Sequence, residues 1–381
     1  MTPDISHEVP GEVSGSPVSK RPSVVAAVYT SAATVIEDIH RAMKLAGVSE
    51  HLDKRAQTLL KINISWQHWY PACSTTPWQL DGVIQSLRRD GFTDLIPAQN
   101  GTVVVDSYEG EIKNGHLPVL EKQGLHSVHL DTPPNAWVPY KPKHKMLVLD
   151  DIFPDGLLIP ESFQGKNIVH LPTMKTHVFT TMTGAMKNAF GGLLNRKRHW
   201  THSVIHETLV DLLAIQKEIH PGIFAVMDGT FAGDGPGPRA MRWHSKNVVL
   251  ASADQVAIDA VAAKMMGFDP TKIGFIRMAH DLGLGCGDPD AIEMVGDDVH
   301  DVNWRFSGVE NTLASRGQKL IYWGPLKFLE RALLRTPIVP WAYFASNLYH
   351  NGYWRNLYGK RRINRAMETE WGKLFRSYTE V

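Results

Sequence analysis

The stretch LPTMKTHVFTTMTGAMKNAFGGLL, residues 171–194, carries charged and polar side chains in an otherwise apolar part of the chain. It begins inside the run KNIVHLP, whose β-branched residues predict a buried strand. The segment TTMTGAMKNAFGG that follows predicts a helix, which Thr180 or Thr181 can cap and Gly191 can close. A strand that leads into a helix is the repeating unit of an α/β fold.

Strand and helix patterns alternate along most of the chain. Short β-branched runs predict strands over residues 22–30, 58–66, 93–100, 144–153, 165–172, 222–230 and 247–254. Apolar side chains at helical spacing predict helices over residues 31–47, 77–91 and 255–267. This alternation predicts an α/β fold, with a mostly parallel sheet flanked by helices.

Composition divides the chain into three parts. Residues 1–22, rich in Pro, Ser and Gly, predict a disordered lead, and residues 23–318 hold the α/β domain. Residues 319–381 form an aromatic-rich C-terminal extension that we expect to be helical, with 13 of the 34 aromatic residues. Eleven basic residues against four acidic ones give this extension a charge of +7, on a chain whose total is +1.

Several roles for the extension are open. Its first part has an apolar side and a basic side, formed by Leu326, Leu329 and Leu333 and by Lys327, Arg331 and Arg335 respectively. Such a helix suits docking on a membrane surface. The same pattern suits a helix packed on its own domain or across a homodimer, and we favour this packing.

Charge and cysteine content limit the class of protein. Forty basic against 39 acidic residues lack the basic surplus of a nucleic-acid binder. Cys73 and Cys286 supply at most two thiolates where an iron–sulfur cluster needs about four ligands, so we expect no such cluster. The N-terminus lacks the apolar core of a signal peptide, and no run of 18 apolar residues occurs. We therefore expect a cytoplasmic protein.

The opening stretch also predicts a binding site. Lys175 and His177 would lie just beyond the carboxyl end of a strand, where open α/β sheets bind ligands. Thr183 and Lys187 are four residues apart and would share a helix face, with Asn188 beside them. Free N–H groups at the helix start, flanked by Lys175 and His177, predict a carboxylate or phosphate site. The alternative is that each lysine reaches the surface and each histidine is structural.

Histidines follow in RHWTHSVIHETLVDL. His202 and His206 are four residues apart, so on one helix they would face the same way, with Asp211 nearby. Such pairs bind metals in some proteins, but no HExxH pattern accompanies them, and we predict no metal ligands. We instead expect His202 or His206 to act as an acid, a base or a substrate-orienting group.

Acidic residues mark a second polar segment, MDGTFAGDGPGPR at residues 227–239. Asp228 and Asp234 among four glycines predict a tight loop at a strand end, able to orient a substrate hydroxyl or cation. The loop lacks the Lys-Ser/Thr of a phosphate-binding P-loop, and an ordinary Asp-Gly turn is a strong alternative. Asp259, inside an apolar helix, needs a partner, for which one of the lysines is a candidate.

Taken in order, these motifs resemble the family catalogued as domain of unknown function 362. LLKINIS resembles its early lysine–x–asparagine strand, here Lys61 and Asn63. The stretch 171–194 resembles its central signature, MDGTFAGDGPGPR its aspartate–glycine loop, and LASADQVAIDAVAAKMMGFDP its closing strand and helix. The resemblance covers roughly residues 23–300.

This resemblance leads to two further comparisons. Many members carry ferredoxin-type cysteine runs that imply four-iron four-sulfur clusters, whereas Cys73 and Cys286 fit no such run. The order of histidines and the lysine helix is also similar to the N-terminal domain of lactate racemase-type enzymes. Those enzymes use histidines as acid and base and a nickel-pincer nucleotide as hydride acceptor, and this similarity is an analogy only.

The hypothesis that follows is an enzyme for a small anionic substrate. Lys175 and Lys187 would bind the anion, while His177 and His202 or His206 would move protons. We expect the principal groups to meet in one cleft, namely Lys61, Asn63, Lys175, His177, Lys187 and Asp228. Isomerisation, redox and group transfer stay open, as does the cofactor. Two alternatives are a non-catalytic accessory protein that binds a ligand or cofactor, and an iron–sulfur- or redox-associated protein that acts with a partner.

Overall fold

The computed structural model describes residues 22–101, 105–308, 310, 313–325, 327–329 and 348–380. Nearly all of the lead expected over residues 1–22 lies outside these ranges. So do Leu326, Arg331, Leu333 and Arg335 of the expected interfacial helix.

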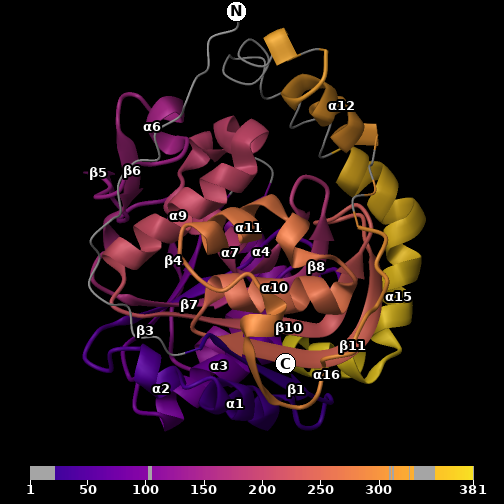
Figure 1. Cartoon of the computed structure of the whole chain (residues 1–381). Helices are drawn as coiled ribbons and strands as arrows, with labels where there is room; N and C mark the ends of the chain where they lie inside the picture. Colours follow the sequence, from indigo (N-terminus) through magenta and orange to yellow (C-terminus); the bar gives the residue numbers. More distant parts are fainter. Residues whose placement is uncertain are drawn as a thin grey trace, which may run out of the picture.

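Ten strands of the described chain form one sheet, in the order β12-β1-β11-β10-β7-β2-β3-β4, with β8 joined to β10 and β9 joined to β8 (Figure 1). The strands are β1 (Val24–Tyr29), β2 (Thr58–Ile62), β3 (Leu95–Gln99), β4 (Val128–His129), β7 (Asn167–Leu171), β8 (Thr173–His177), β9 (Thr181–Met182), β10 (Ile223–Asp234), β11 (Arg242–Ser252) and β12 (Glu293–Gly296). A separate antiparallel pair joins β5 (Trp137–Tyr140) and β6 (Leu157–Pro160).

Strand direction confirms the mostly parallel sheet. From β10 through β7, β2 and β3 to β4, every neighbour runs parallel. Only β11 reverses direction between β10 and β1, and β9 turns back on β8. The carboxyl ends of the parallel strands therefore lie at one edge, which is where such sheets bind ligands.

Helices cover both faces of the sheet, as Figure 1 shows. They are α1 (Val35–Leu45), α2 (Val48–His51), α3 (Pro77–Arg89), α4 (Ser107–Lys113), α5 (His116–Lys122), α6 (Leu149–Ile152), α7 (Gly184–Asn188), α8 (Phe190–Leu193), α9 (Ile205–Ile219), α10 (Gln255–Met266), α11 (Gly274–Asp281), α12 (Leu313–Tyr322), α15 (Lys360–Met367) and α16 (Glu370–Thr379). Short 3-10 segments include η2 (Arg196–Val204), and η6 (Leu348–Gly359) is a π-helix.

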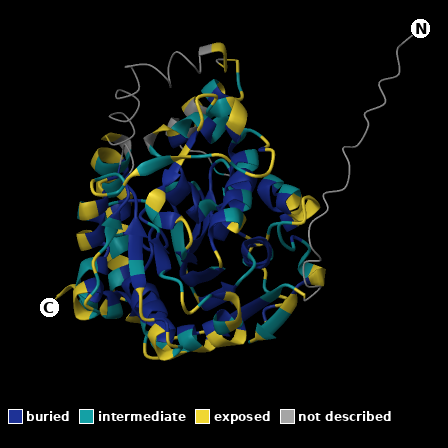
Figure 2. Ribbon diagram, turned by 90° about the vertical axis from the view of Figure 1, so that its left-hand side faces the viewer, coloured by how far each residue is buried: buried dark blue, intermediate teal, exposed yellow. Residues whose placement is uncertain are grey.

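Each face carries its own hydrophobic core, and Figure 2 shows buried residues along the strands between them. Side chains of α7, α9, α10 and α11 form one core, and those of α1, α3 and α16 form the other.

Helix ends follow local chemistry. Thr76 and Gln79 form a capping box at α3, and Asp254 accepts hydrogen bonds from the first N–H groups of α10. Gly267 ends α10 with a φ of 98°.

Three local predictions were wrong, and one strand was missed. Residues 144–153 are not a strand: the chain forms α6, and the Asp211 carboxylate of α9 accepts the N–H groups of Leu147, Val148 and Leu149. Lys175 and His177 lie beyond the carboxyl end of β7, but on a second strand, β8, which was not predicted. The helix expected over residues 180–192 is β9 followed by α7 and α8. Finally, β10 continues to Asp234, so Asp228 and Asp234 belong to one strand.

The described part of the C-terminal extension packs on the body. Trp354, Trp371 and Phe375 are buried in the same core as α1 and α3. The Trp371 ring lies 5.2 Å from that of Trp78, and Phe375 stacks on Trp69. Within the described ranges, no helix has the length and apolar character needed to cross a bilayer.

Candidate functional site

Lys61 lies near the carboxyl end of β2 and is almost fully buried. Its Nζ donates to the carbonyl oxygen of Ile62 at 2.6 Å, and Asn188 Nδ2 donates to the Lys61 carbonyl at 2.8 Å. A Cβ on Gly192 would lie 2.9 Å from Lys61 Cε, so this glycine makes room for the lysine stem. Burial, together with the nearby charge of Arg198, lowers the pKa of Lys61 to about 7.

Lys175 lies on β8 and has no exposed surface. Its Nζ donates to Ser65 Oγ at 3.1 Å and to the carbonyl oxygen of Cys73. Asn63 belongs to the same network, since its Nδ2 donates to the Cys73 carbonyl at 3.3 Å and its Oδ1 accepts from Ser65 Oγ at 3.0 Å. Burial lowers the pKa of Lys175 to about 8. No carboxylate of the described chain balances this ammonium through an ion pair.

Lys187 lies on α7 and is partly exposed. Its Nζ lies 5.4 Å from the centroid of the Phe190 ring. Among the described residues it makes no hydrogen bond and no ion pair. Burial, followed by the charges of Lys175 and Arg198, lowers the pKa of Lys187 to about 7. Because the charges of Lys175 and Arg198 act on Lys187, these three side chains lie in one region of the protein.

The start of α7 is not a free anion site, contrary to the expectation from sequence. Asp259 of α10 accepts from the backbone N of Ala185 at 2.5 Å and of Met186 at 3.0 Å. The partner of Asp259 is therefore a helix end rather than a lysine. Gly184, with a φ of 72°, allows this approach, because a Cβ there would lie 2.4 Å from the carboxyl carbon. Burial raises the pKa of Asp259 to about 8.

Thr183 stands at the junction of β9 and α7. Its backbone N donates to the Lys175 carbonyl at 3.0 Å, so it lies directly beside that lysine. Its Oγ1 is buried and has no hydrogen-bond partner within the described chain. A buried hydroxyl without a partner is costly, which is consistent with a water molecule or ligand at this point.

His177 closes β8 and is buried. Its Nδ1 lies 3.2 Å from the backbone N of Phe179, which donates to it, and 3.0 Å from Thr180 Oγ1. Burial holds the pKa of His177 well below its usual value, and nearby Lys187 lowers it further. His177 is therefore neutral at neutral pH and can accept a proton only when a reaction supplies the driving force.

His202 and His206 do not share a helix, contrary to the prediction. His202 lies on η2, where its ring stacks on Tyr322 of α12 with centroids 5.9 Å apart, and burial lowers its pKa to about 4. Its ring also meets the edge of Phe190 at 5.5 Å. His206 lies on α9, and its Nδ1 accepts from the backbone N of Phe275 at 3.1 Å. This bond uses one nitrogen of His206 to join α9 to α11.

The two aspartates of β10 hold structure together. Asp228 is buried, and its carboxylate accepts from Thr76 Oγ1 at 2.5 Å and from the backbone N of Thr230 at 2.7 Å. Among the described contacts, no hydrogen bond or ion pair joins it to the three lysines. Its bonds connect β10 to the start of α3.

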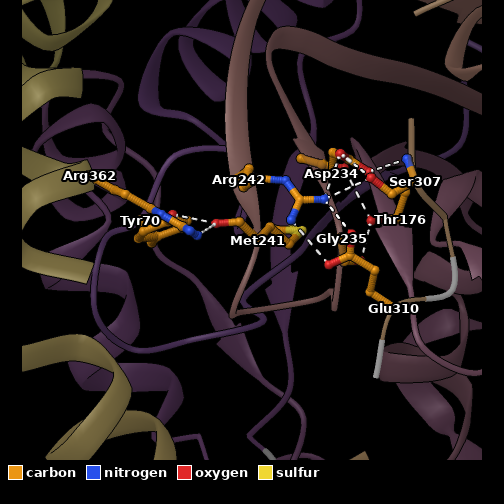
Figure 3. Close-up of polar contacts among 10 residues, drawn as sticks. Tyr70, Thr176, Asp234, Gly235, Met241, Arg242, Ser307, Glu310 and Arg362 are labelled. Carbon is orange, nitrogen blue, oxygen red and sulfur yellow. Dashed lines mark hydrogen bonds and ion pairs between the residues drawn. The ribbon is translucent and has the colours of Figure 1, made fainter. Parts of the chain in front are cut away.

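Asp234 belongs to a separate charged network, drawn in Figure 3. It pairs with Arg242 at 3.0 Å and accepts from the backbone N of Ser307 at 2.8 Å. Arg242 also pairs with Glu310 at 2.7 Å. Thr176, the neighbour of Lys175, donates to the carbonyl of Gly235 at 2.7 Å in the same view. Asp234 thus joins the end of β10 to the start of β11 and to Ser307, and no described bond joins it to a lysine.

Sequence patterns missed part of this region. Arg198 Nη2 donates to the Gly101 carbonyl at 2.9 Å, and its charge acts on both Lys61 and Lys187. Arg239 Nε donates to the Ser65 carbonyl at 3.0 Å, on the Lys175 side. The run RKRHW was a signal for Arg198, whereas the contribution of Ser65 depends on a loop that no pattern predicts. Within the described ranges, no group of His, Cys, Asp and Glu could hold a metal ion.

These features define an α/β protein with a cationic region, formed by Lys61 of β2, Lys175 of β8 and Lys187 of α7. Residues 58–264 match the family model described as Domain of unknown function (DUF362), over more than half of the chain, and the chain belongs to that family. A 26% identical relative is the thylakoid-associated protein sll1697 of Synechocystis, aligned over 66% of this chain and 74% of its own length. No solved structure matches. The comparisons do not show the similarity to lactate racemase-type enzymes.

Proposed function

We propose that the protein is an enzyme that binds a small carboxylate or phosphate beside Lys187 and moves protons on it with lysine and histidine side chains. The observation that carries this proposal is Lys187 itself. Its ammonium has no counter-ion among the described residues and retains some exposure, so a dissolved anion can reach it. Lys175 and the hydroxyl of Thr183, which lacks a partner, would lie further inside.

The lowered pKa values of the lysines support proton transfer. A lysine with a pKa near 7 is part neutral at neutral pH, so Lys187 can take a proton from a bound substrate or return one. A bound anion stabilises the charged form, which makes anion binding favour protonated Lys187. Neutral His177 and His202 would accept hydrogen bonds or protons as charge develops.

The free thiols of Cys73 and Cys286 support a cytoplasmic location as part of this proposal. A second candidate is a carrier that holds a ligand in the same place without turnover. Its support is the complete burial of Lys175, which suits retention of a ligand.

Anion binding is testable by thermal shift. We expect phosphate, sulfate or a small carboxylate to raise the melting temperature of the wild-type protein. Lys187→Met removes the charge and keeps the apolar stem, so the affinity should fall roughly tenfold or more, because a sheltered charge-assisted contact contributes about 1.5–3 kcal/mol. Lys217→Met, at an exposed lysine of α9, is the matched control and should bind as the wild type does. Equal stabilisation of the wild type and Lys187→Met would assign the anion to another residue.

Turnover separates the enzyme from the carrier. Mass spectrometry of small molecules that co-purify with the native protein supplies candidate substrates. An enzyme should convert one of them, and Lys187→Ala should abolish conversion while the circular dichroism spectrum stays unchanged. A ligand that co-purifies but is never converted would favour the carrier.

A further inference from the structure

Exposed apolar side chains gather on the C-terminal part of the protein. Of fourteen large apolar side chains exposed among the described residues, seven lie between residues 320 and 358, namely Leu320, Trp323, Phe328, Leu348, Tyr353, Leu357 and Tyr358. Phe328 is 77% exposed and Leu348 is 61% exposed. Exposed apolar side chains that gather in one place mark an interaction site, whereas single exposed ones are ordinary.

One continuous surface runs along η6 and α15, and we call it the C-terminal ridge. Its members are Leu348, Tyr353, Leu357, Tyr358, Lys360, Arg361 and Arg365, all of them exposed. Leu348, Tyr353 and Leu357 of η6 are five and four residues apart, close to one turn of a π-helix, which aligns them on one side. Arg361 follows four residues later, at the start of the α-helix α15. The ridge therefore has an apolar half followed by a basic half.

The opposite side of the same helices is fixed to the body. Trp354 is buried, with its ring 6.1 Å from that of Trp66 and 5.3 Å from that of Tyr70. Arg362 Nη1 donates to the Met241 carbonyl at 2.5 Å, a bond drawn in Figure 3. The backbone carbonyl of Arg362 accepts from Trp243 Nε1 at 2.9 Å. Figure 1 places α15 at the outer edge of the molecule. The ridge is thus held facing outward by a rigid base.

Charge identifies the surface that would complement the ridge. Lys360, Arg361 and Arg365 form no ion pair with any described residue, and the extension as a whole carries +7 on a chain of +1. An anionic surface would neutralise these charges. Leucine and tyrosine beside them suit the boundary between headgroups and acyl chains, since tyrosine combines an apolar ring with a polar tip.

We propose that the C-terminal ridge docks the protein on a bilayer that contains anionic lipids. The apolar half enters the headgroup boundary and the basic half contacts lipid phosphates. A second copy of the chain is a poorer partner, because the same surface of that copy carries the same excess of basic residues and would not neutralise them. Nucleic acid would attract the charges but would leave Leu348 and Leu357 exposed to water. This docking does not depend on the proposed enzyme activity.

Vesicle binding tests the proposal with the full-length protein. We expect sedimentation with vesicles of phosphatidylcholine and phosphatidylglycerol, little with phosphatidylcholine alone, and weaker binding as salt rises. Lys360→Glu with Arg361→Glu should weaken binding at least tenfold, since each basic residue near an anionic surface contributes roughly fivefold. The double variant Leu348→Ser with Leu357→Ser should also weaken vesicle binding, because it removes apolar side chains from the ridge.

Matched controls lie outside the ridge. Leu282→Ser, at a position 56% exposed, and Lys44→Glu, at an exposed lysine of α1, should leave vesicle binding unchanged. Failure of the wild-type protein to sediment with anionic vesicles would overturn the proposal, as would equal sedimentation of the ridge variants. If light scattering instead finds a dimer that the two leucine substitutions dissociate, and vesicles do not bind, the ridge is a contact between copies.

Discussion

At the scale of single residues, the lysines are the least ordinary feature of this protein. Lys175 is fully buried, and its hydrogen-bond partners among the described residues are one hydroxyl and one carbonyl rather than a carboxylate. Burial without a counter-ion disfavours the charged form, which is why the pKa falls to about 8. A methionine would fill a similar volume without this cost, so stability does not explain the lysine.

The lysine makes stability depend on pH. In the unfolded chain the Lys175 pKa is near the ordinary lysine value of 10.5, and in the folded protein it is about 8. Below about pH 8 both states carry the charge and the burial penalty is fully present; the penalty fades as pH rises toward 10.5. From this lysine alone, the free energy of unfolding should therefore rise with pH in that window, by up to about 3 kcal/mol.

Lys175→Met should lack that rise. We expect urea unfolding at about pH 7 and about pH 10 to give a smaller difference for Lys175→Met than for the wild type. Lys217→Met, which removes an exposed lysine, should keep the wild-type difference. The same pH dependence in the wild type and in Lys175→Met would mean that the ammonium is not disfavoured by burial.

At the scale of elements, the short helix α7 positions the cationic region. It carries Lys187, and its Asn188 binds the Lys61 carbonyl. The helix spans only five residues, too few to be stable alone, so Asp259 and Gly184 fix its start. Displacing α7 would move Lys187 relative to Lys175.

Gly184→Ala tests this role. The new Cβ would lie 2.4 Å from the carboxyl carbon of Asp259, at a φ of 72° that non-glycine residues rarely adopt. We expect a loss of at least about 1–2 kcal/mol in unfolding free energy, and weaker anion binding by the thermal-shift assay. Gly191→Ala is the control, because its Cβ would meet only Lys61 Nζ, at 3.8 Å. Similar losses in both variants would mean that the clash with Asp259 and the positive φ at Gly184 are not the cause.

Elements with a regular pattern were predictable from sequence. Pro77 at the first turn of α3 and Gly267 after α10 marked helix ends that the structure confirms. By contrast, β8 follows directly after Pro172, and its pairing with β10 is a long-range contact that no local pattern encodes. α6 depends on a carboxylate more than sixty residues away, so a β-branched run there was misleading.

The candidate region was predictable in part, for the same reason. Lys175, His177 and Lys187 were found because they are close in sequence and polar in an apolar stretch. Asp228 was expected to join them, but Thr76 and Thr230 satisfy its carboxylate. The identity of the partner decides whether a buried acid is structural, and that partner is 152 residues away.

At the scale of the whole molecule, the C-terminal extension completes one of the two cores. Trp371 lies 5.2 Å from Trp78 of α3, and Tyr378 donates to Asp81 of the same helix at 3.0 Å. The extension therefore stabilises the sheet and also presents the ridge. Since the cationic region and the ridge share no residue, ligand binding and docking can be tested separately.

Trp371→Ala tests whether the extension and the body form one cooperative unit. Trp371 is 4% exposed, and its Nε1 donates to Asn247 Oδ1 at 2.8 Å. Its loss should lower the unfolding free energy by about 3–5 kcal/mol, because a large cavity opens in a core that α3 shares. Calorimetry should show one transition at a lower temperature, as expected when both parts unfold together. Lys373→Ala, at an exposed residue of the same helix, should leave the transition nearly unchanged. An early separate transition in Trp371→Ala, with the main midpoint unmoved, would mean that the extension unfolds independently of the sheet.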